Sequence, residues 1–266
     1  MTLTQNSPIF LLGGQRSGTT ALAYSLSNAF SDNNGIFTVN GKLLYYLNRW
    51  LTFEDLYHRH FRVDEIIYSL KRKLPGGRDI ESWLTYTEKI LNHFSKEVAD
   101  GKHFDPYLLA NSIMHECYQP FGMWGEKYNE YLIHFDYLNK ILPEAKIILL
   151  YRNPITVAKS VEEWKGYRPW KPSNKENMID KWTIWHERIL SQVSELGNER
   201  LLVIEYDQMC NNQETEKLSN FVGIDLESYL INMKSQRESN YDINNLPKNT
   251  QNIIKQLETY KKIGVI

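Results

Sequence analysis

A strand, a glycine-rich turn and a helix start follow one another at residues 8–26, PIFLLGGQRSGTTALAYSL. The turn GGQRSGTT fits the phosphate-loop spacing G-x-x-x-x-G-K-[ST] except that Thr19 stands where the lysine belongs. An arginine, Arg16, lies inside the loop instead. After a buried strand, such a turn directs backbone N–H groups toward an anion and adds the positive end of a helix dipole. The turn therefore predicts an α/β fold with an anion site at this loop.

Four short apolar runs rich in β-branched residues predict buried strands, and a weaker fifth run lies at residues 123–125. The four stronger runs are Ile9–Leu12, Ile36–Val39, Lys146–Tyr151 and Leu201–Glu205. Helical patterns alternate with them at residues 18–30, 131–142, 155–164 and 179–196. This alternation predicts a three-layer α/β fold in which helices flank a parallel sheet. Because ligands bind at the carboxyl ends of such strands, the turns after Leu12, Leu150 and Ile204 should open on one edge.

Residues 50–118 show a different pattern, with helical periodicity and many aromatic side chains but no convincing strand. The turn KLPGGRD at residues 73–79 divides this stretch into two helical parts. We interpret residues 50–118 as a helical insertion that covers the active edge of a single domain spanning residues 1–266.

The charge balance of the chain argues against a nucleic-acid partner, since 31 basic residues nearly cancel 32 acidic ones. No apolar stretch approaches the roughly 20 residues of a membrane span, and no export signal precedes the first strand. Cys117 and Cys210 lie far apart without metal-ligand spacing, which favours a cytoplasmic protein with two reduced thiols. No heptad pattern that would predict an oligomer is present.

A nucleotide kinase or ATPase is one interpretation of the phosphate loop. Phosphoryl transfer needs Mg²⁺, which a carboxylate at the end of a neighbouring strand helps to hold. The strand in KIILLYRNP ends in Arg152, whereas LLVIEYD offers Glu205 and Asp207. The missing loop lysine and the arginine at a strand end favour a second anion that the protein binds directly, without a metal.

Several motifs, in order along the chain, resemble those of sulfotransferases that use 3′-phosphoadenosine 5′-phosphosulfate (PAPS). The loop GGQRSGTTAL is similar to the family's 5′-phosphosulfate loop, and ILLYRNPITVAKSVEEW is similar to its 3′-phosphate motif. Further segments that resemble the family are MWGEKYNEYL, LLVIEYDQM and the tail SQRESNYDI. The resemblance covers most of the chain outside residues 50–118 and implies the P-loop-like sulfotransferase fold.

The resemblance also implies roles for individual residues. The expected 5′-phosphosulfate loop comprises Gly14, Gln15, Arg16, Ser17, Gly18, Thr19 and Thr20. Lys127 would join Arg16 in stabilising the transferring sulfuryl group, and Arg152 and Ser160 would bind the 3′-phosphate. Tyr206 would lie near the adenine, and Arg237 in the tail is a further candidate for the 3′-phosphate.

The general base is where the sequence departs from the family. Some members place a histidine two residues after the strand-end lysine, but this chain has Asn129 there. Others place a glutamate just after the second strand, where this chain reads VNGKLLYYL. The remaining candidates are Glu126 first, because it lies beside the strand-end lysine, then His60, followed by His58 and His103.

We therefore expect a transferase that moves a sulfuryl group from PAPS to a hydroxyl of a small-molecule, lipid or glycan acceptor, without a metal. The alternatives are the P-loop nucleotide kinase or ATPase and a catalytically inactive nucleotide-binding protein. The motif KGYRPWK at residues 165–171 mixes cations with aromatic rings and could line the acceptor cleft or form a solvated loop.

Overall fold

The computed structural model describes residues 7–165, 171–231, 233 and 242–263 of the chain. Arg237 and most of the KGYRPWK motif, residues 166–170, lie outside the described residues. No helix in the described ranges is long and apolar enough to cross a membrane.

Five parallel strands form one sheet, in the order β2-β3-β1-β4-β5. Their bounds are β1 Ile9–Leu12, β2 Ile36–Val39, β3 Trp124–Lys127, β4 Lys146–Tyr151 and β5 Leu201–Glu205. The four stronger sequence predictions are confirmed residue for residue, and the weaker fifth run is a strand that extends to Lys127. The central strand β1 pairs Phe10 with Glu126 of β3 on one side and with Ile147 of β4 on the other.

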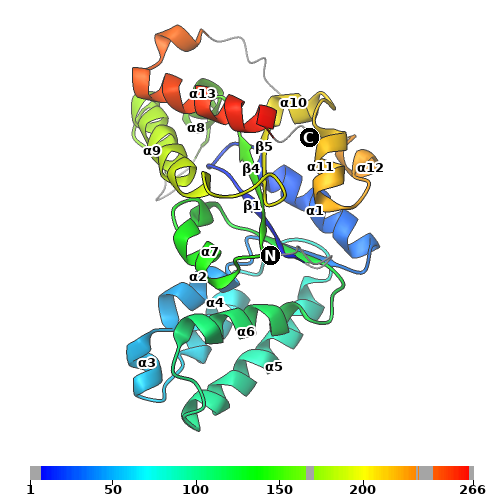
Figure 1. The fold of residues 1–266 in the computed structure, drawn as a ribbon, viewed down its shortest axis with the longest axis vertical. Coiled ribbons are helices and arrows are strands. Elements are labelled where there is room, and N and C mark those ends of the chain that lie inside the picture. The colour runs from blue at the N-terminus through cyan, green and yellow to red at the C-terminus, as the bar shows by residue number, and fades with distance from the viewer. Residues whose placement is uncertain (1–6, 166–170, 232, 234–241, 264–266) are drawn as a thin grey trace.

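Alternating side chains of the strands divide the core into two clusters, one on each face of the sheet. Phe10 and Leu12 pack into one cluster, with α7, α8, α9 and α13. Ile9 and Leu11 pack into the other, with α1, α11 and α12. Figure 1 shows these two groups of helices on opposite sides of the sheet, which confirms the predicted three-layer α/β fold.

Helices follow the strands in the predicted alternation. Outside residues 40–118, they are α1 Thr19–Asp32, η1 Asn129–Leu132 (a 3-10 helix), α7 Phe135–Ile141, α8 Pro154–Glu162, α9 Lys175–Val193, α10 Tyr206–Cys210, α11 Thr215–Val222, α12 Glu227–Leu230, η2 Ile243–Asn245 (3-10) and α13 Lys248–Ile263. The predicted helix at residues 131–142 is thus two shorter helices, η1 and α7, because the chain turns at residues 133 and 134.

The insertion is helical, as expected, but contains more helices than the two predicted parts. Its helices are α3 Phe53–Tyr57, α4 Val63–Arg72, α5 Ile80–Ala99 and α6 Pro106–Tyr118, and α2 Leu43–Trp50 directly precedes them. They gather at the lower end of the molecule in Figure 1. Buried residues of these helices, such as Trp83 and Tyr118, belong to the same core cluster as Phe10 of β1. This continuous core supports the single-domain organisation, which stays a prediction.

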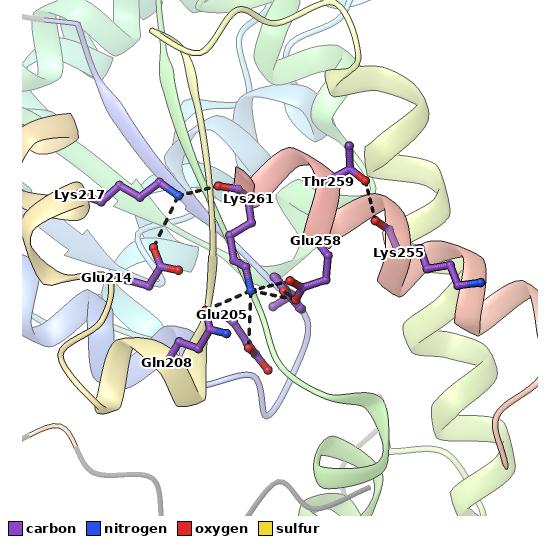
Figure 2. Close-up of polar contacts among 9 residues, drawn as sticks. Glu205, Gln208, Glu214, Lys217, Lys255, Glu258, Thr259 and Lys261 are labelled. Atoms are coloured by element: carbon purple, nitrogen blue, oxygen red, sulfur yellow. Dashed lines mark hydrogen bonds and ion pairs between the residues drawn. The ribbon is translucent and has the colours of Figure 1, made fainter. Parts of the chain in front are cut away.

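The last helix, α13, is held against the carboxyl ends of β4 and β5 by a buried lysine. Lys261 is 7% exposed, and its Nζ donates to Gln208 Oε1 at 3.0 Å and to Glu258 Oε1 at 2.9 Å. The same ammonium lies 3.9 Å from Glu205 Oε2 at the end of β5. Figure 2 shows these contacts converging on Lys261, and Tyr151 at the end of β4 also donates to Glu258. The cluster therefore joins the C-terminal helix to the edge of the sheet.

Replacing Lys261 with methionine should destabilise the fold by about 2 kcal/mol, since it leaves the largely covered Glu205 carboxylate without its cation. The measurement is the free energy of unfolding in urea. The matched control is Lys255→Met on the exposed face of the same helix, which should change that free energy by less than about 0.5 kcal/mol. Equal losses of unfolding free energy in Lys261→Met and Lys255→Met would contradict a stabilising role of the contacts around Lys261.

Candidate anion and active site

A cavity of about 470 Å³ opens at the carboxyl edge of the sheet. The residues that line it are Gln15, Arg16, Gly18, Thr19, Thr20, Ala21, Asn40, Lys127, Asn129, Arg152, Ser160, Trp164 and Tyr206. Segments at or just after the carboxyl ends of all five strands contribute, which is the edge where parallel sheets bind ligands. No residue of the insertion from 50 to 118 is among them.

The phosphate loop turns sharply between β1 and α1. The Ser17 N–H donates to Gly14 O at 3.3 Å. Helix α1 begins at Thr19 without a side-chain cap, which leaves its first backbone amides available to a ligand at the helix N-terminus. Gly18 has a left-handed backbone with φ 86°, and a Cβ there would lie 2.0 Å from the ring of Tyr206. Glycine is thus required at this position by both the backbone and the packing of the aromatic ring.

Arg16 is also left-handed, with φ 66°, and a non-glycine residue in that region is strained. Its Nε donates to Ser160 Oγ at 3.0 Å. Its guanidinium carbon lies 4.3 Å from the centre of the Trp164 ring, so the cation stacks on an aromatic face. Both partners come from the segment of α8 and just after it, which links the phosphate loop to the predicted 3′-phosphate motif.

Lys127 brings a second cation into the cavity although its side chain is buried, with 1% of the residue exposed. Its Nζ donates to three neutral oxygens: Asn129 Oδ1 at 2.8 Å, Asn40 Oδ1 at 3.0 Å and Thr20 Oγ1 at 3.3 Å. Burial, aided by the nearby Lys42, lowers the pKa of Lys127 to about 8. At neutral pH it is therefore an ammonium group held by uncharged acceptors.

Arg152 provides the third cation, just after β4. Its Nη2 lies 3.0 Å from Asp207 Oδ1, and both side chains are less than 10% exposed. The guanidinium carbon is 4.7 Å from the centre of the Tyr206 ring. The backbone carbonyl of Arg152 accepts from Trp182 Nε1 at 3.0 Å, so α9 fixes the main chain at this point.

The cavity brings together most of the residues that the sequence singles out. Nine of them line it: Gln15, Arg16, Gly18, Thr19, Thr20, Lys127, Arg152, Ser160 and Tyr206. Gly14 and Ser17 belong to the loop but do not line the cavity, and the Ser17 side chain is fully buried. Ser160 and Arg152 reach the same cavity, although Ser160 pairs with Arg16 and Arg152 pairs with Asp207.

The base candidates lie elsewhere. Glu126 and Lys127 are neighbours on β3, so their side chains point to opposite faces of the sheet, and Glu126 is fully buried away from the cavity. His60 and His58 are exposed near α3, and His103 pairs with Glu97 at 2.9 Å. None of these four side chains is among the residues lining the cavity.

Sequence reasoning did not assign four residues that line the cavity: Ala21, Asn40, Asn129 and Trp164. The asparagines stand near the positions where relatives carry a base, and both hold the Lys127 ammonium. Asn129 also donates through Nδ2 to Gly13 O at 2.7 Å, which connects Lys127 to the phosphate loop. The amide at position 129 is therefore a structural link.

His186 on α9 is a further residue without a sequence signal. It is fully buried, stacks on Trp182 at 4.0 Å between ring centres, and shares a 2.6 Å hydrogen bond between Nδ1 and Trp182 O. Because a carbonyl only accepts, Nδ1 carries the proton. A Cβ at Gly14 would lie 3.7 Å from its ring, so His186 packs beneath the phosphate loop.

A strand–glycine loop–helix unit, three cations and a shared cavity at the carboxyl edge of the sheet define the class of this protein, an α/β protein with a cationic cavity at that edge. Within this class, the chain belongs to the sulfotransferase family, whose model matches residues 8–228. No curated protein sequence matches the chain.

Two solved structures share the fold across nearly the whole chain. The sulfotransferase domain from the Synechococcus PCC 7002 olefin synthase has 16% identity and a TM-score of 0.59, with 97% of each chain covered. The sulfotransferase domain from the curacin biosynthetic pathway has 15% identity and a TM-score of 0.55, covering 95% of this chain and 98% of that one.

His186 should make the protein sensitive to acid. Burial lowers its pKa from 6.5 to about 4, so between these values the unfolded chain binds the proton that the folded chain excludes. Stability is therefore undiminished above about pH 6.5 and falls as the pH drops toward 4, by on the order of 2 kcal/mol at pH 5.

Urea unfolding at about pH 7.5 and pH 5 tests this assignment. The free energy of unfolding that is lost between these two pH values should be smaller in His186→Phe than in the wild type, by on the order of 2 kcal/mol. His58→Gln, at an exposed histidine, should retain the full loss. An equal loss of unfolding free energy in the wild type and in His186→Phe would refute the assignment of the acid sensitivity to His186.

Proposed function

We propose that this sulfotransferase transfers a sulfuryl group from PAPS to a hydroxyl of a small-molecule, lipid or glycan acceptor. The observation that carries the proposal is the single cavity in which Arg16, Lys127, Arg152 and Ser160 meet. Two phosphate-type groups on one ligand need two cationic subsites, and the cavity offers the loop with Arg16 and, beside it, the end of β4 with Arg152.

The residues present fit the donor in their chemistry. The amides of Ser17–Thr20 and the Arg16 guanidinium are suited to the 5′-phosphosulfate. Arg152 and Ser160 are suited to the 3′-phosphate, and Tyr206 offers a ring near it for the adenine. Arg237, from outside the described residues, stays a proposed further contact to the 3′-phosphate.

When bound, the donor supplies a sulfuryl group on an activated bond to its 5′-phosphate. The part of this chain is electrostatic: Arg16 and the Lys127 ammonium provide fixed positive charge where negative charge grows during transfer. Lys127 needs no reorganisation because three oxygens already hold its ammonium group. Glu126 and His60 are left out of the proposed catalytic set, because neither lines the cavity.

The metal-nucleotide alternative would use the carboxylates after β5. Asp207 is paired with Arg152, and Glu205 lies beside Lys261, so neither side chain is directed into the cavity. Among the described residues, no cluster of three histidine, cysteine or acidic side chains could hold a metal ion. The pairing of both carboxylates with cations therefore favours direct binding of an anionic donor. Cys117 and Cys210, both free thiols, are compatible with the proposed cytoplasmic location.

Calorimetry with 3′,5′-adenosine bisphosphate, ATP and Mg·ATP separates the sulfotransferase from a kinase or ATPase. The bisphosphate should bind at least about tenfold more tightly than either form of ATP, because only it carries the 3′-phosphate. Tighter binding of Mg·ATP would support the kinase, and no binding of the bisphosphate would sink the proposal. Incubation of the PAPS-loaded protein with candidate hydroxyl compounds, followed by mass spectrometry for a gain of one SO₃, separates an active enzyme from an inactive binding protein.

Arg152→Ala should lower the affinity for 3′,5′-adenosine bisphosphate by about 10- to 100-fold, the usual loss for one charge-assisted hydrogen bond. The affinity for adenosine 5′-phosphate should fall far less, because this nucleotide has no 3′-phosphate that could contact Arg152. Lys159→Ala, an exposed cation on α8, is the control and should change neither affinity. Equal losses for the two nucleotides would contradict the 3′-phosphate assignment.

A further inference from the structure

The loop between β2 and α2, residues 40–42, has a backbone that its own sequence does not favour. Asn40 and Lys42 are both left-handed, with φ 60° and 65°, at a cost on the order of 1 kcal/mol each. Helix α2 begins at Leu43, and the Lys42 side chain does not cap it. Contacts from outside the loop must therefore stabilise this conformation.

Glu126 of β3 provides those contacts. Its Oε1 accepts from the Leu43 N–H at 3.1 Å, so a side chain from another strand caps the first turn of α2. Gly41 packs directly on this carboxylate: a Cβ there would lie 2.7 Å from Glu126 Oε1 and 2.3 Å from Thr38 Oγ1. The loop is thus pressed onto Glu126, and only glycine fits between them.

The next residue on β3 holds the same loop from the opposite face of the sheet. The Lys127 ammonium donates to Asn40 Oδ1 at 3.0 Å, and the Asn40 N–H donates to Lys127 O at 2.7 Å. Asn40 and Lys127 both line the anion cavity, whereas Glu126 does not. A displacement of the loop would therefore remove one of the three oxygens that hold the ammonium.

We propose that Glu126 is a positioning residue, which acts through residues 40–42 to hold Asn40 against the Lys127 ammonium in the anion cavity. Only the consequence for sulfuryl transfer rests on the proposed function; the contact itself belongs to the free protein. Glu126 thus supports the Lys127 ammonium from the opposite face of the sheet and does not act as the general base.

The anchor does not require a negative charge. Burial raises the pKa of Glu126 to about 7, against the lowering effects of Tyr131, of the Leu43 and Lys42 backbone amides and of the Lys42 charge. Tyr118 and Tyr46 are the other titratable groups that interact with it. A protonated carboxyl keeps an oxygen that accepts from Leu43, and so does a glutamine amide. Glu126→Gln is therefore the conservative variant, and Glu126→Leu removes the acceptor.

Two measurements on the free protein test the proposal: amide hydrogen exchange at residues 41–43, and NMR titration of the Lys127 Cε group. In Glu126→Leu the amides should exchange at least about tenfold faster, while the amides of β1 and β4 keep their protection. The pKa of Lys127 should fall by about one unit more than in Glu126→Gln, because the ammonium loses the Asn40 oxygen. The glutamine variant controls for the lost charge.

Asn40→Ala provides a second route, which does not disturb the Glu126 contact. It should lower the pKa of Lys127 by as much as Glu126→Leu does relative to Glu126→Gln, and adding Asn40→Ala to Glu126→Leu should lower the pKa no further. Equal pKa values in Glu126→Leu and Glu126→Gln, or no shift in Asn40→Ala, would overturn the proposal. Since neither readout needs a nucleotide, a failure to bind the bisphosphate would refute the proposed function and leave this test standing.

Discussion

The site depends on one buried ammonium group held by three uncharged oxygens. Thr20 comes from the phosphate loop, Asn40 from the loop after β2, and Asn129 from the turn after β3. Lys127 is therefore the point where three loops meet, and the parallel register of β2, β3 and β1 brings them to one edge. Because none of the three partners carries a charge, the positive charge of the lysine is not neutralised inside the cavity, where low dielectric strengthens its field.

The phosphate loop gains its own cation by a different route. In the usual spacing a lysine follows the second glycine, on the helix, whereas here Arg16 lies within the turn in a strained left-handed conformation. Its hydrogen bond to Ser160 and its stacking on Trp164 offset part of that strain. Both partners belong to the segment after β4, so the altered loop and the second anion motif depend on each other.

The sequence was sufficient for the sheet and for most of the cavity, because both are encoded locally. Apolar runs mark the strands, and residues such as Arg152 lie directly at strand ends, where a parallel sheet exposes them. Pairings between distant segments leave no such pattern. Nothing in the sequence shows that Asn129 reaches Gly13, that Trp164 stacks on Arg16, or which of the two neighbours Glu126 and Lys127 faces the cavity. Its sequence position beside Lys127 makes Glu126 the first candidate for the base, but that position does not show which face of the sheet the side chain occupies.

Three carboxylates lie near this edge of the sheet, and each of them either pairs with a cation or points away from the cavity. Asp207 is tied to Arg152, Glu205 lies beside Lys261, and Glu126 is turned behind β3 to the backbone of α2. Among the described residues that line the cavity, the charged groups at neutral pH are Arg16, Lys127 and Arg152, all cations. A chain whose net charge is only −1 thus concentrates positive potential at one point. The ion pairs of Asp207 and Glu205, together with the placement of Glu126 on the opposite face of β3 from Lys127, thus leave a cationic cavity on a nearly neutral protein.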